Sequence, residues 1–381
     1  MAKFQDYMSA IGRRVFRLLP VKKNRVVFSS YHGRGYSDSP KAVAQALLAS
    51  KEKLELLWLV KNESEAKSLP AGIRPVSYRS GLSRAWAYAT AKVWVDNCRK
   101  GEKSKRRGQK YMQLWHGFAM KRIEADAPHS LTPEYIKGCR QDSDQCDLMV
   151  SGSRFMTGLY KKSFWYEGSV EEWGTPRNDV FFTPGVLPQK VREALHLPQD
   201  RCLALYAPTF RADHSLDAYK LDADKLLAAC EAQFGGQWSL LVRLHPNIAH
   251  KSWGLFAYDG ERVLDATMYP DMQELLVGCD LLLTDYSSCM FDFALGRKPC
   301  LRFATDVEDY RQDRGFYFPV DSLPFPLADS NEALEQAILH FDQKAYEKAW
   351  EAFAKEQGFC EDGKAAQRCA RWILGIIQNK E

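Results

Sequence analysis

The sequence predicts an α/β protein made of two doubly wound, Rossmann-like domains, and three observations support this fold class. The chain has 381 residues, and at roughly 150 residues per domain this length favours two domains over one. Short apolar, β-rich runs alternate with helical patterns, as parallel βαβ units require. The alternation occurs in two sets, and the stretch between them, 174–200, is rich in proline and turn residues, which is typical of a linker.

The first set of elements precedes this linker. Short apolar runs predict buried strands, and apolar residues spaced three and four apart predict helices that cover a sheet. In chain order we expect a strand at 25–30, a helix at 40–50, a strand at 54–60, a helix at 82–91, a strand at 93–97 and a strand that begins near Tyr111.

The second set of elements follows Pro184 and Pro188 and shows the same alternation. Gly296 suits the end of a helix, because glycine accepts the left-handed conformation common at that position. Strands are expected at 202–207, 239–244, 263–265, 280–284 and 300–303, and helices at 223–234, 272–278, 289–295 and, with polar sequences, from about 331 to 379.

These patterns divide the chain into four expected parts. Two doubly wound domains are expected to enclose a cleft at the carboxyl ends of their strands, where open α/β sheets bind ligands. A helix at the C-terminus can cross back to the first domain. The expected parts are a basic amphipathic helix at 1–24, a first domain at 25–183, a second domain at 184–355 and a C-terminal helix at 356–381.

Residues 3–19 have an amphipathic pattern. On a helical wheel the Lys and Arg residues lie opposite an apolar arc of about 120°. Two interpretations remain open: the helix can lie in a lipid headgroup layer with its cations on anionic lipid, or it can dock on its own domain. The arc contains Phe4, Tyr7, Met8, Ile11, Val15, Leu18 and Leu19.

The charge is unevenly distributed along the chain. The formal net charge is +5, but residues 1–25 and 99–110 each carry seven Lys or Arg against one acidic residue, so the remainder is acidic. Two such basic segments attract anionic partners such as nucleic acid, membrane headgroups or a phosphorylated substrate. They lack the interleaved aromatic residues of a stacking surface for nucleic acid, so we expect no nucleic-acid partner.

Composition also excludes several classes of protein. No apolar run approaches the roughly 20 residues of a membrane-spanning helix. Arg17 interrupts the only apolar stretch near the N-terminus, so we expect no secretory signal and a chain that stays in the cytosol. The ten cysteines form no C-x-x-C pair and are typical of reduced core thiols, not of a disulfide or zinc framework.

The segment 280–288 predicts a buried strand that runs into a polar turn at a helix N-terminus. Ser287 and Ser288 fall at that N-terminus, where free N–H groups and the helix dipole suit a phosphate. Thr284, Asp285 and Ser287 can also simply cap the helix. The spacing alone does not decide between these two interpretations.

Two histidines follow other predicted strands. Arg243 and His245 come at the carboxyl end of the strand at 239–244, where together they can hold a phosphoryl group and stabilise its charge. His116, followed by Gly117, comes where another strand opens into a loop. With an unperturbed pKa of about 6.5, its imidazole can act as a general base near neutral pH. Taken singly, each histidine can also be structural.

Weaker candidates follow a further strand and a helix. Thr209 and Arg211 come after the strand at 202–207, and Glu274 could present its carboxylate to sugar hydroxyls. The sequence has no Walker-type loop, G-x-G-x-x-G, H-E-x-x-H or G-x-S-x-G motif. These absences disfavour P-loop, dinucleotide-binding, zincin and hydrolase interpretations.

These segments together resemble motifs of the CDP-glycerol:poly(glycerophosphate) glycerophosphotransferase family, the bacterial teichoic acid primases and polymerases. The resemblance covers roughly residues 25–305, and seven motifs in order are far more specific than any one of them. The matching segments are Ser37-Asp-Ser-Pro40, Lys105-Arg-Arg-Gly-Gln-Lys-Tyr111, Trp115-His-Gly117, Gly174-Thr-Pro-Arg-Asn-Asp179, Ala207-Pro-Thr-Phe-Arg211, Arg243-Leu-His-Pro-Asn247 and Thr284-Asp-Tyr-Ser-Ser288 with Phe291-Asp292.

The resemblance implies a GT-B architecture, in which two Rossmann-like domains face an interdomain cleft, at the cytoplasmic face of the cell membrane. It implies that a hydroxyl of a polyprenyl-diphosphate-linked saccharide acceptor attacks the β-phosphorus of CDP-glycerol, with release of CMP. It gives no certain cofactor and leaves a divalent metal open. The matched motifs assign catalysis to His116 and His245, phosphate binding to Arg243, Thr284, Ser287 and Ser288, nucleotide binding to Thr209, Arg211 and Glu274, and support to Gly117 and Asp285.

Departures from the family pattern keep alternatives open. The family's usual Thr-Pro-Leu is Phe118-Ala-Met120 here, and its Thr-Trp-Arg-Asp is Thr209-Phe-Arg-Ala-Asp213. A CDP-ribitol phosphotransferase and a sugar-nucleotide glycosyltransferase are therefore alternative enzymes, and a non-catalytic basic protein that binds RNA or membrane is the alternative of another class. The chain lacks the additional domains of the long polymerases, which favours single addition over chain extension.

Overall fold

The protein was analysed as a computed structural model that describes residues 8, 11–12, 14–100, 105–127, 131–211, 216–244, 254–307 and 315–378. The chain divides into two compact units. Unit 1 contains Met1–His116, Glu124–Asp179 and Gly358–Glu381, and unit 2 contains Gly117–Ile123 and Val180–Gln357.

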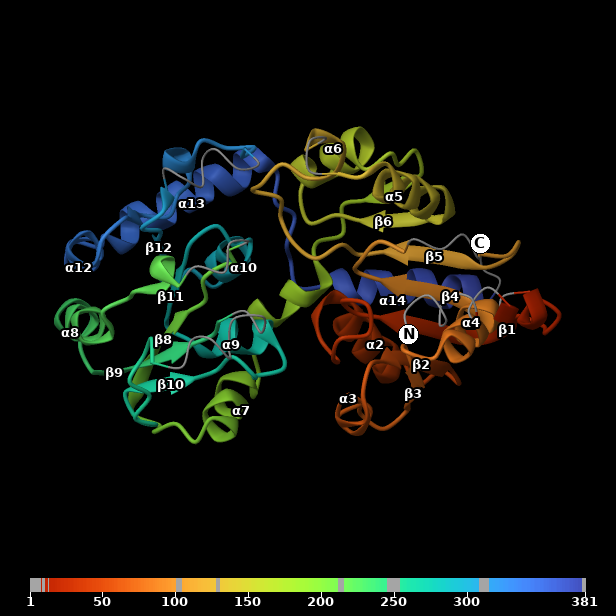
Figure 1. Ribbon diagram of the computed structural model, residues 1–381, viewed down its shortest axis with the longest axis horizontal. Coiled ribbons are helices and arrows are strands. Elements are labelled where there is room, and N and C mark those ends of the chain that lie inside the picture. Colours follow the sequence, from red (N-terminus) through yellow and green to blue (C-terminus); the bar gives the residue numbers. More distant parts are fainter. Residues whose placement is uncertain are drawn as a thin grey trace. The chain divides into compact units, whose positions relative to one another are not determined.

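Unit 1 is built on a seven-stranded sheet in the order β3-β2-β1-β4-β5-β6-β7 (Figure 1). Every neighbouring pair is parallel, so all the strands end at the same edge. The strands are β1 (Lys22–Ser29), β2 (Glu55–Val60), β3 (Ile73–Ser77), β4 (Ala91–Asp96), β5 (Lys110–Gln113), β6 (Leu148–Val150) and β7 (Ser169–Glu171).

Alternating side chains of these strands form a core on each face of the sheet, as the two-residue period of a strand dictates. On one face Phe28 and Trp58 pack with α2 and α14, and on the other Val27 and Trp94 pack with α4. The helices of unit 1 are α2 (Asp38–Ala49), α3 (Glu63–Lys67), α4 (Gly81–Thr90), α5 (Pro133–Gln145), α6 (Arg154–Ser163) and α14 (Ala365–Ile377), with a 3₁₀ turn at Glu124–Asp126.

Unit 2 is built on a six-stranded parallel sheet in the order β10-β9-β8-β11-β12-β13. Its strands are β8 (Arg201–Tyr206), β9 (Gln237–Val242), β10 (Val263–Asp265), β11 (Leu281–Thr284), β12 (Cys300–Phe303) and β13 (Leu327–Ala328). Its helices are α7 (Leu187–Ala194), α8 (Ala223–Phe234), α9 (Met272–Gly278), α10 (Cys289–Phe293), α12 (Asn331–Leu339) and α13 (Gln343–Gln357), with 3₁₀ turns at Asp217–Tyr219, Ala294–Gly296 and Val320–Ser322.

The predicted linker at 174–200 is only partly correct. It contains a 3₁₀ turn at Pro176–Phe181 and the helix α7. Helix α7 packs closely on α9, because a Cβ added at Gly278 would come within 3.2 Å of Val191. Proline at the start of α7 is compatible with a helix, since the first turn needs no N–H donor there. The linker therefore contributes an element of unit 2.

The limits of the two units also differ from the expected ones. Residues 117–123 belong to unit 2, where Lys121 forms an antiparallel bridge with Phe316. The ring centres of Phe118 and Phe291 lie 4.5 Å apart. Phe118-Ala-Met120, the departure from the family pattern, is thus part of an aromatic core. At the other end of the chain, α14 packs on α2 of unit 1.

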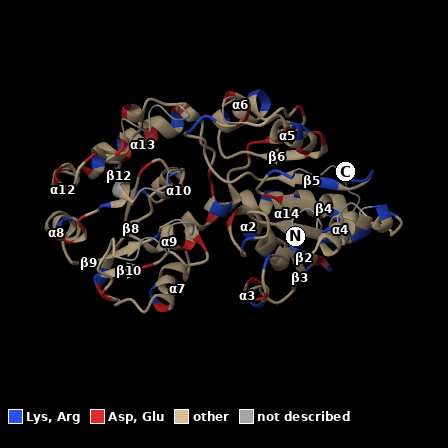
Figure 2. Cartoon of the chain, in the orientation of Figure 1, with Lys and Arg blue, Asp and Glu red and all other residues tan. Residues whose placement is uncertain are grey.

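The polar sequences after residue 331 form α12 and α13, and Figure 2 shows Lys or Arg interspersed with Asp or Glu along α13. All ten cysteines are free thiols, as their spacing predicted. None of the helices among the described residues is long and apolar enough to cross a membrane.

Ten of the residues of the amphipathic helix predicted at 1–24 lie outside the described residues; described helical residues reach Phe16, and β1 already begins at Lys22. The described part packs on α4, because a Cβ added at Gly12 would lie 3.0 Å from a Leu82 side-chain carbon. Val15 and Leu18 remain 54% and 87% exposed. One side of this segment is therefore docked on unit 1 while apolar side chains of another side stay exposed.

Candidate functional site

His116 follows β5 at the carboxyl edge of the sheet of unit 1. The turn is held by the buried side chain of Gln113, whose Oε1 accepts a hydrogen bond from the Trp115 N–H at 2.9 Å and whose Nε2 donates to the Cys98 carbonyl at 3.0 Å. Trp115 has φ +51° and Gly117 has φ +151°. The turn therefore leaves the ordinary strand conformation at this histidine.

The environment of His116 determines which ring nitrogen carries the proton. Its Nδ1 lies 2.7 Å from the Asn97 carbonyl oxygen, which can only accept, so Nδ1–H donates and Nε2 keeps its lone pair. The Trp115 ring stacks on the imidazole at 4.3 Å between centres, and the Tyr31 ring lies at 5.8 Å. Burial lowers the pKa of His116, so the neutral imidazole that a general base needs is favoured.

A buried ion pair stands beside this histidine. Arg177 Nη1 lies 2.8 Å from Asp38 Oδ2, and the Tyr31 hydroxyl donates to the same oxygen at 2.7 Å. Burial alone would raise the pKa of Asp38, but Arg177 and the hydrogen bonds from Tyr31 and the Ser39 N–H outweigh it and hold the pKa below its ordinary value. Asp38 and Arg177 belong to two of the motifs quoted above, and sequence reasoning assigned them no role.

In unit 2, Arg211, for which nucleotide binding was predicted, is the centre of a second buried network. Its guanidinium lies 2.8 Å from Asp285 Oδ2 and 2.5 Å from Asp306 Oδ2. It also donates to the Thr209 carbonyl at 2.8 Å, and the Thr209 N–H donates to Asp285 at 2.9 Å. Because these protein groups occupy the guanidinium, Arg211 joins the loop after β8 to the loop after β11.

Glu274, which was predicted to contact a sugar, lies in a cluster of hydrogen-bonded side chains. Its side chain is buried, and its carboxylate accepts from Lys190 Nζ at 2.7 Å and from the Tyr269 hydroxyl at 2.8 Å. Arg243 Nη1 donates to the Tyr269 carbonyl at 2.5 Å. Arg243 and Glu274 are thus brought together through Tyr269, and Glu274 anchors this cluster instead of facing open surface.

The predicted phosphate ligands at the polar turn after β11 differ in burial. Thr284 is fully buried and its hydroxyl donates to the Ala207 carbonyl at 2.6 Å. Ser287 and Ser288 are only half-buried, and Ser288 is the N-cap of α10 without a side-chain cap hydrogen bond. The Ser287 hydroxyl accepts from the Cys289 N–H at 3.4 Å. His245 lies outside the described residues.

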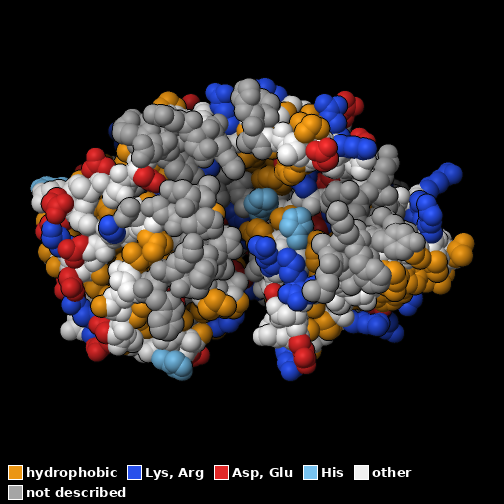
Figure 3. Space-filling view, viewed as in Figure 1, with side chains coloured by type: hydrophobic (Ala, Val, Ile, Leu, Met, Phe, Trp, Pro, Cys, Tyr) orange, Lys and Arg blue, Asp and Glu red, His pale blue; other side chains and the backbone are white. Residues whose placement is uncertain are grey.

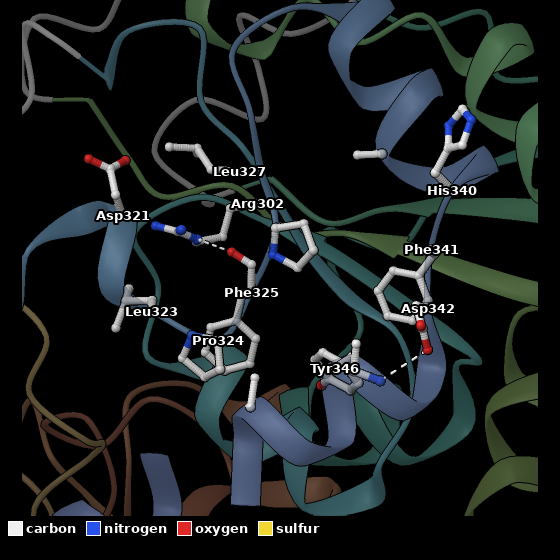
Figure 4. A pocket seen from close by; sticks show the side chains of 14 residues that line it. Arg302, Asp321, Leu323, Pro324, Phe325, Leu327, His340, Phe341, Asp342 and Tyr346 are labelled. Atoms are coloured by element: carbon white, nitrogen blue, oxygen red, sulfur yellow. Dashed lines mark hydrogen bonds between the residues drawn. The ribbon is translucent and has the colours of Figure 1, made fainter. Parts of the chain in front are cut away.

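A cavity of about 550 Å³ lies in unit 2 (Figure 4). It is lined by β12, β13 and the helices α12 and α13, and contains none of the predicted site residues. Arg302 lies in its wall and donates through Nε to the Phe325 carbonyl at 3.0 Å. Tyr346 also lines it, and its buried hydroxyl has no hydrogen-bond partner among the described residues.

Residues 11–375 match the CDP-Glycerol:Poly(glycerophosphate) glycerophosphotransferase family. A teichoic acid poly(glycerol phosphate) polymerase of Staphylococcus epidermidis is 30% identical over 91% of this chain, which spans only 50% of that relative's length. A teichoic acid glycerol-phosphate transferase of Staphylococcus aureus is 30% identical over 92% of this chain and 93% of the relative.

A solved structure is also similar. A variant of the wall teichoic acid polymerase TagF, soaked with CDPG, matches with a TM-score of 0.84 and 29% identity over 98% of this chain and 94% of that chain. Together with the two parallel sheets of six and seven strands, this likeness confirms the predicted GT-B fold class.

Proposed function

Because this chain belongs to the CDP-glycerol:poly(glycerophosphate) glycerophosphotransferase family, we propose that it transfers glycerol phosphate from CDP-glycerol to a polyprenyl-diphosphate-linked acceptor, a teichoic acid or capsule precursor, and releases CMP. The names of the similar proteins support glycerol phosphate as the transferred group, and the CDPG soak of a similar polymerase supports the donor. The observation in this chain that carries the proposal is the fixed tautomer of His116.

His116 is the general base in this mechanism. Its Nδ1–H is held by the Asn97 carbonyl, so Nε2 accepts the proton of the acceptor hydroxyl as that oxygen attacks the β-phosphorus of CDP-glycerol. A new P–O bond to the acceptor forms, and the bond from the β-phosphorus to the bridging oxygen of CMP breaks. CMP leaves with that electron pair. The lowered pKa of His116 keeps the base unprotonated near neutral pH.

The diphosphate of the donor is held by residues of unit 2. We assign Arg243, Ser287 and Ser288 to this task, since Arg243 supplies a cation and the serines supply hydroxyls at the turn after β11. His245 keeps its predicted role beside Arg243. Thr209, Arg211 and Glu274 stay assigned to the nucleotide in this proposal. Asp285 supports them through its contacts with Thr209 and Arg211.

The protein acts in this proposal at the cytoplasmic face of the membrane, bound peripherally. Val15 and Leu18 expose apolar surface beside the exposed Arg14 and Arg17, a combination that favours anionic headgroups. Val15→Ser with Leu18→Ser should weaken binding to phosphatidylglycerol vesicles. Val186→Ser, at another exposed apolar residue, should not. Equal binding by both variants would contradict the peripheral docking of this segment.

A donor screen tests the proposed reaction. The protein is incubated with CDP-glycerol, CDP-ribitol or a UDP-sugar and a soluble prenyl-diphosphate disaccharide, and released nucleotide is quantified. We expect acceptor-dependent CMP release, fastest with CDP-glycerol. Faster release from CDP-ribitol would assign the other alditol. UDP release would instead favour the glycosyltransferase alternative.

A further inference from the structure

Cationic side chains surround Tyr78, which follows β3 in unit 1. The Lys61 Nζ lies 5.5 Å from the centre of the Tyr78 ring, and the Arg84 Cζ lies 5.1 Å from it. The His32 ring contacts the same ring edge-on at 6.4 Å between centres. We call His32, Lys61 and Arg84, together with Arg34 from the same loop as His32, the Tyr78 basic cluster.

This cluster shares the sheet edge that carries His116. Lys61 follows β2, the loop with His32 and Arg34 follows β1, and His116 follows β5. The strands are parallel neighbours in the order β3-β2-β1-β4-β5, so their carboxyl ends meet at one edge. Tyr31, the chain neighbour of His32, also has its ring 5.8 Å from the His116 ring. In Figure 3, histidine side chains of this unit lie beside a group of Lys and Arg side chains.

Other basic residues of unit 1 act on Lys61 of the cluster. Burial and then Arg34 lower the pKa of Lys61, Glu65 raises it, and Arg79 lowers it by a smaller effect. Glu65 caps the backbone instead, because its carboxylate accepts from the Lys61 N–H at 2.7 Å. Such mutual repulsion among cations is relieved when an anion binds between them.

The other carboxylate that acts on the cluster is Asp96. It favours the charged form of His32, whereas burial, which is the largest effect, and the cations Lys100 and Lys61 lower the pKa of that imidazole. Asp96 is already ion-paired with Lys100. Among the described residues, the carboxylates of Glu65 and Asp96, which act on Lys61 and His32, therefore each have another partner.

The backbone that presents His32 has an unusual conformation. Tyr31, His32 and Gly33 have φ values of +44°, +58° and +80° in succession. A Cβ at Gly33 would come within 2.7 Å of the Tyr78 Cβ, so the loop is packed directly against Tyr78. Left-handed conformations of non-glycine residues persist where the surroundings enforce them, and they gather at ligand sites. Here they place His32 and Arg34 at the exposed edge of the sheet.

We propose that the Tyr78 basic cluster binds a phosphate group of the acceptor and thereby orients the acceptor hydroxyl toward His116. This inference rests on the proposed function. It differs from the donor diphosphate site, which we assigned to residues of unit 2. The ligand of the proposed site is an anion with several phosphate oxygens, which charge-assisted hydrogen bonds hold. Lys61 and Arg34 contact the phosphate, while Arg84 and Tyr78 position Lys61.

The test compares Lys61→Gln with Lys53→Gln. Lys53 is an exposed lysine that precedes the same strand β2, at the opposite edge of the sheet. Two acceptors are used, a soluble prenyl-diphosphate disaccharide and the octyl glycoside of the same disaccharide, which has no phosphate. Loss of a charge-assisted contact should raise the KM for the diphosphate acceptor about tenfold or more. The KM for the glycoside and for CDP-glycerol should stay unchanged.

Further variants separate charge from folding. Lys61→Arg keeps the charge and should recover most of the acceptor KM, and Arg34→Gln should act like Lys61→Gln. An equal rise in KM for both acceptors, or a rise confined to CDP-glycerol, would overturn the proposal. If the wild type released no CMP with either acceptor, the proposed function would fail. Binding of inorganic pyrophosphate, weaker in Lys61→Gln than in Lys53→Gln, would then still support the anion site, and equal binding would refute it.

Discussion

The buried ion pair between Asp38 and Arg177 provides a quantitative test of how the fold supports His116. Both side chains are 5% exposed and their charged atoms lie 2.8 Å apart. Asp38→Asn leaves Arg177 buried without its counter-charge, and removing one partner of a buried pair costs about 3–5 kcal/mol. At 1.4 kcal/mol per factor of ten, local protection against hydrogen exchange should fall by a hundredfold or more.

Hydrogen exchange followed by mass spectrometry resolves this effect within the chain. Peptides from α2 should lose protection in Asp38→Asn, whereas peptides from α8 in unit 2 serve as the internal control. Asp38→Asn combined with Arg177→Met removes both charges and should restore much of the protection. Equal protection in wild type and Asp38→Asn, or a double variant no better than the single one, would refute the assignment.

Four further outcomes are expected. Arg211→Met leaves the carboxylates of Asp285 and Asp306 without their cation and should destabilise unit 2 by about 3–5 kcal/mol in urea unfolding; a change below about 1 kcal/mol would contradict the network. The acid limb of kcat/KM should lie below pH 6.5, because burial lowers the pKa of His116 and the base stays neutral to lower pH; a limb above 6.5 would oppose this. The contribution of Asp38 to stability should be present above about pH 4, the unfolded pKa, and be lost as pH falls through its lower folded pKa. Equal stability of wild type and Asp38→Asn at all pH values would contradict this. Tyr346→Phe removes a buried hydroxyl that has no partner among the described residues, so thermal unfolding should show unchanged or slightly raised stability; a clear loss would reveal an unseen partner.

Strand positions could be predicted from local sequence, because a buried parallel strand must be a short apolar run. The strands at 263–265 and 300–303 have the predicted limits. Helix α7 was missed because Pro184 and Pro188 resemble linker residues, although proline is compatible with the first turn of a helix. Strands β6 and β7 were also missed, although they have three residues each, as β10 does, so length alone does not explain the difference.

The candidate site was only partly predictable for a different reason. Sequence shows that a residue carries charge, but not which groups neutralise it. Arg211 was therefore predicted to bind a nucleotide, whereas Asp285 and Asp306 occupy its guanidinium. The pairing of Asp38 with Arg177 joins positions 139 residues apart, and no local pattern records it. His116 was found because its strand-end position and its following glycine are local features.

Single-turnover release of CMP from CDP-glycerol by His116→Ala tests the central claim most directly. The variant is compared with wild type and with His340→Ala, which removes an exposed histidine of unit 2, at saturating donor and acceptor. Loss of a general base should slow CMP release by about 10²–10⁴-fold, while His340→Ala should match wild type. Undiminished release by His116→Ala would show that this imidazole is not the base.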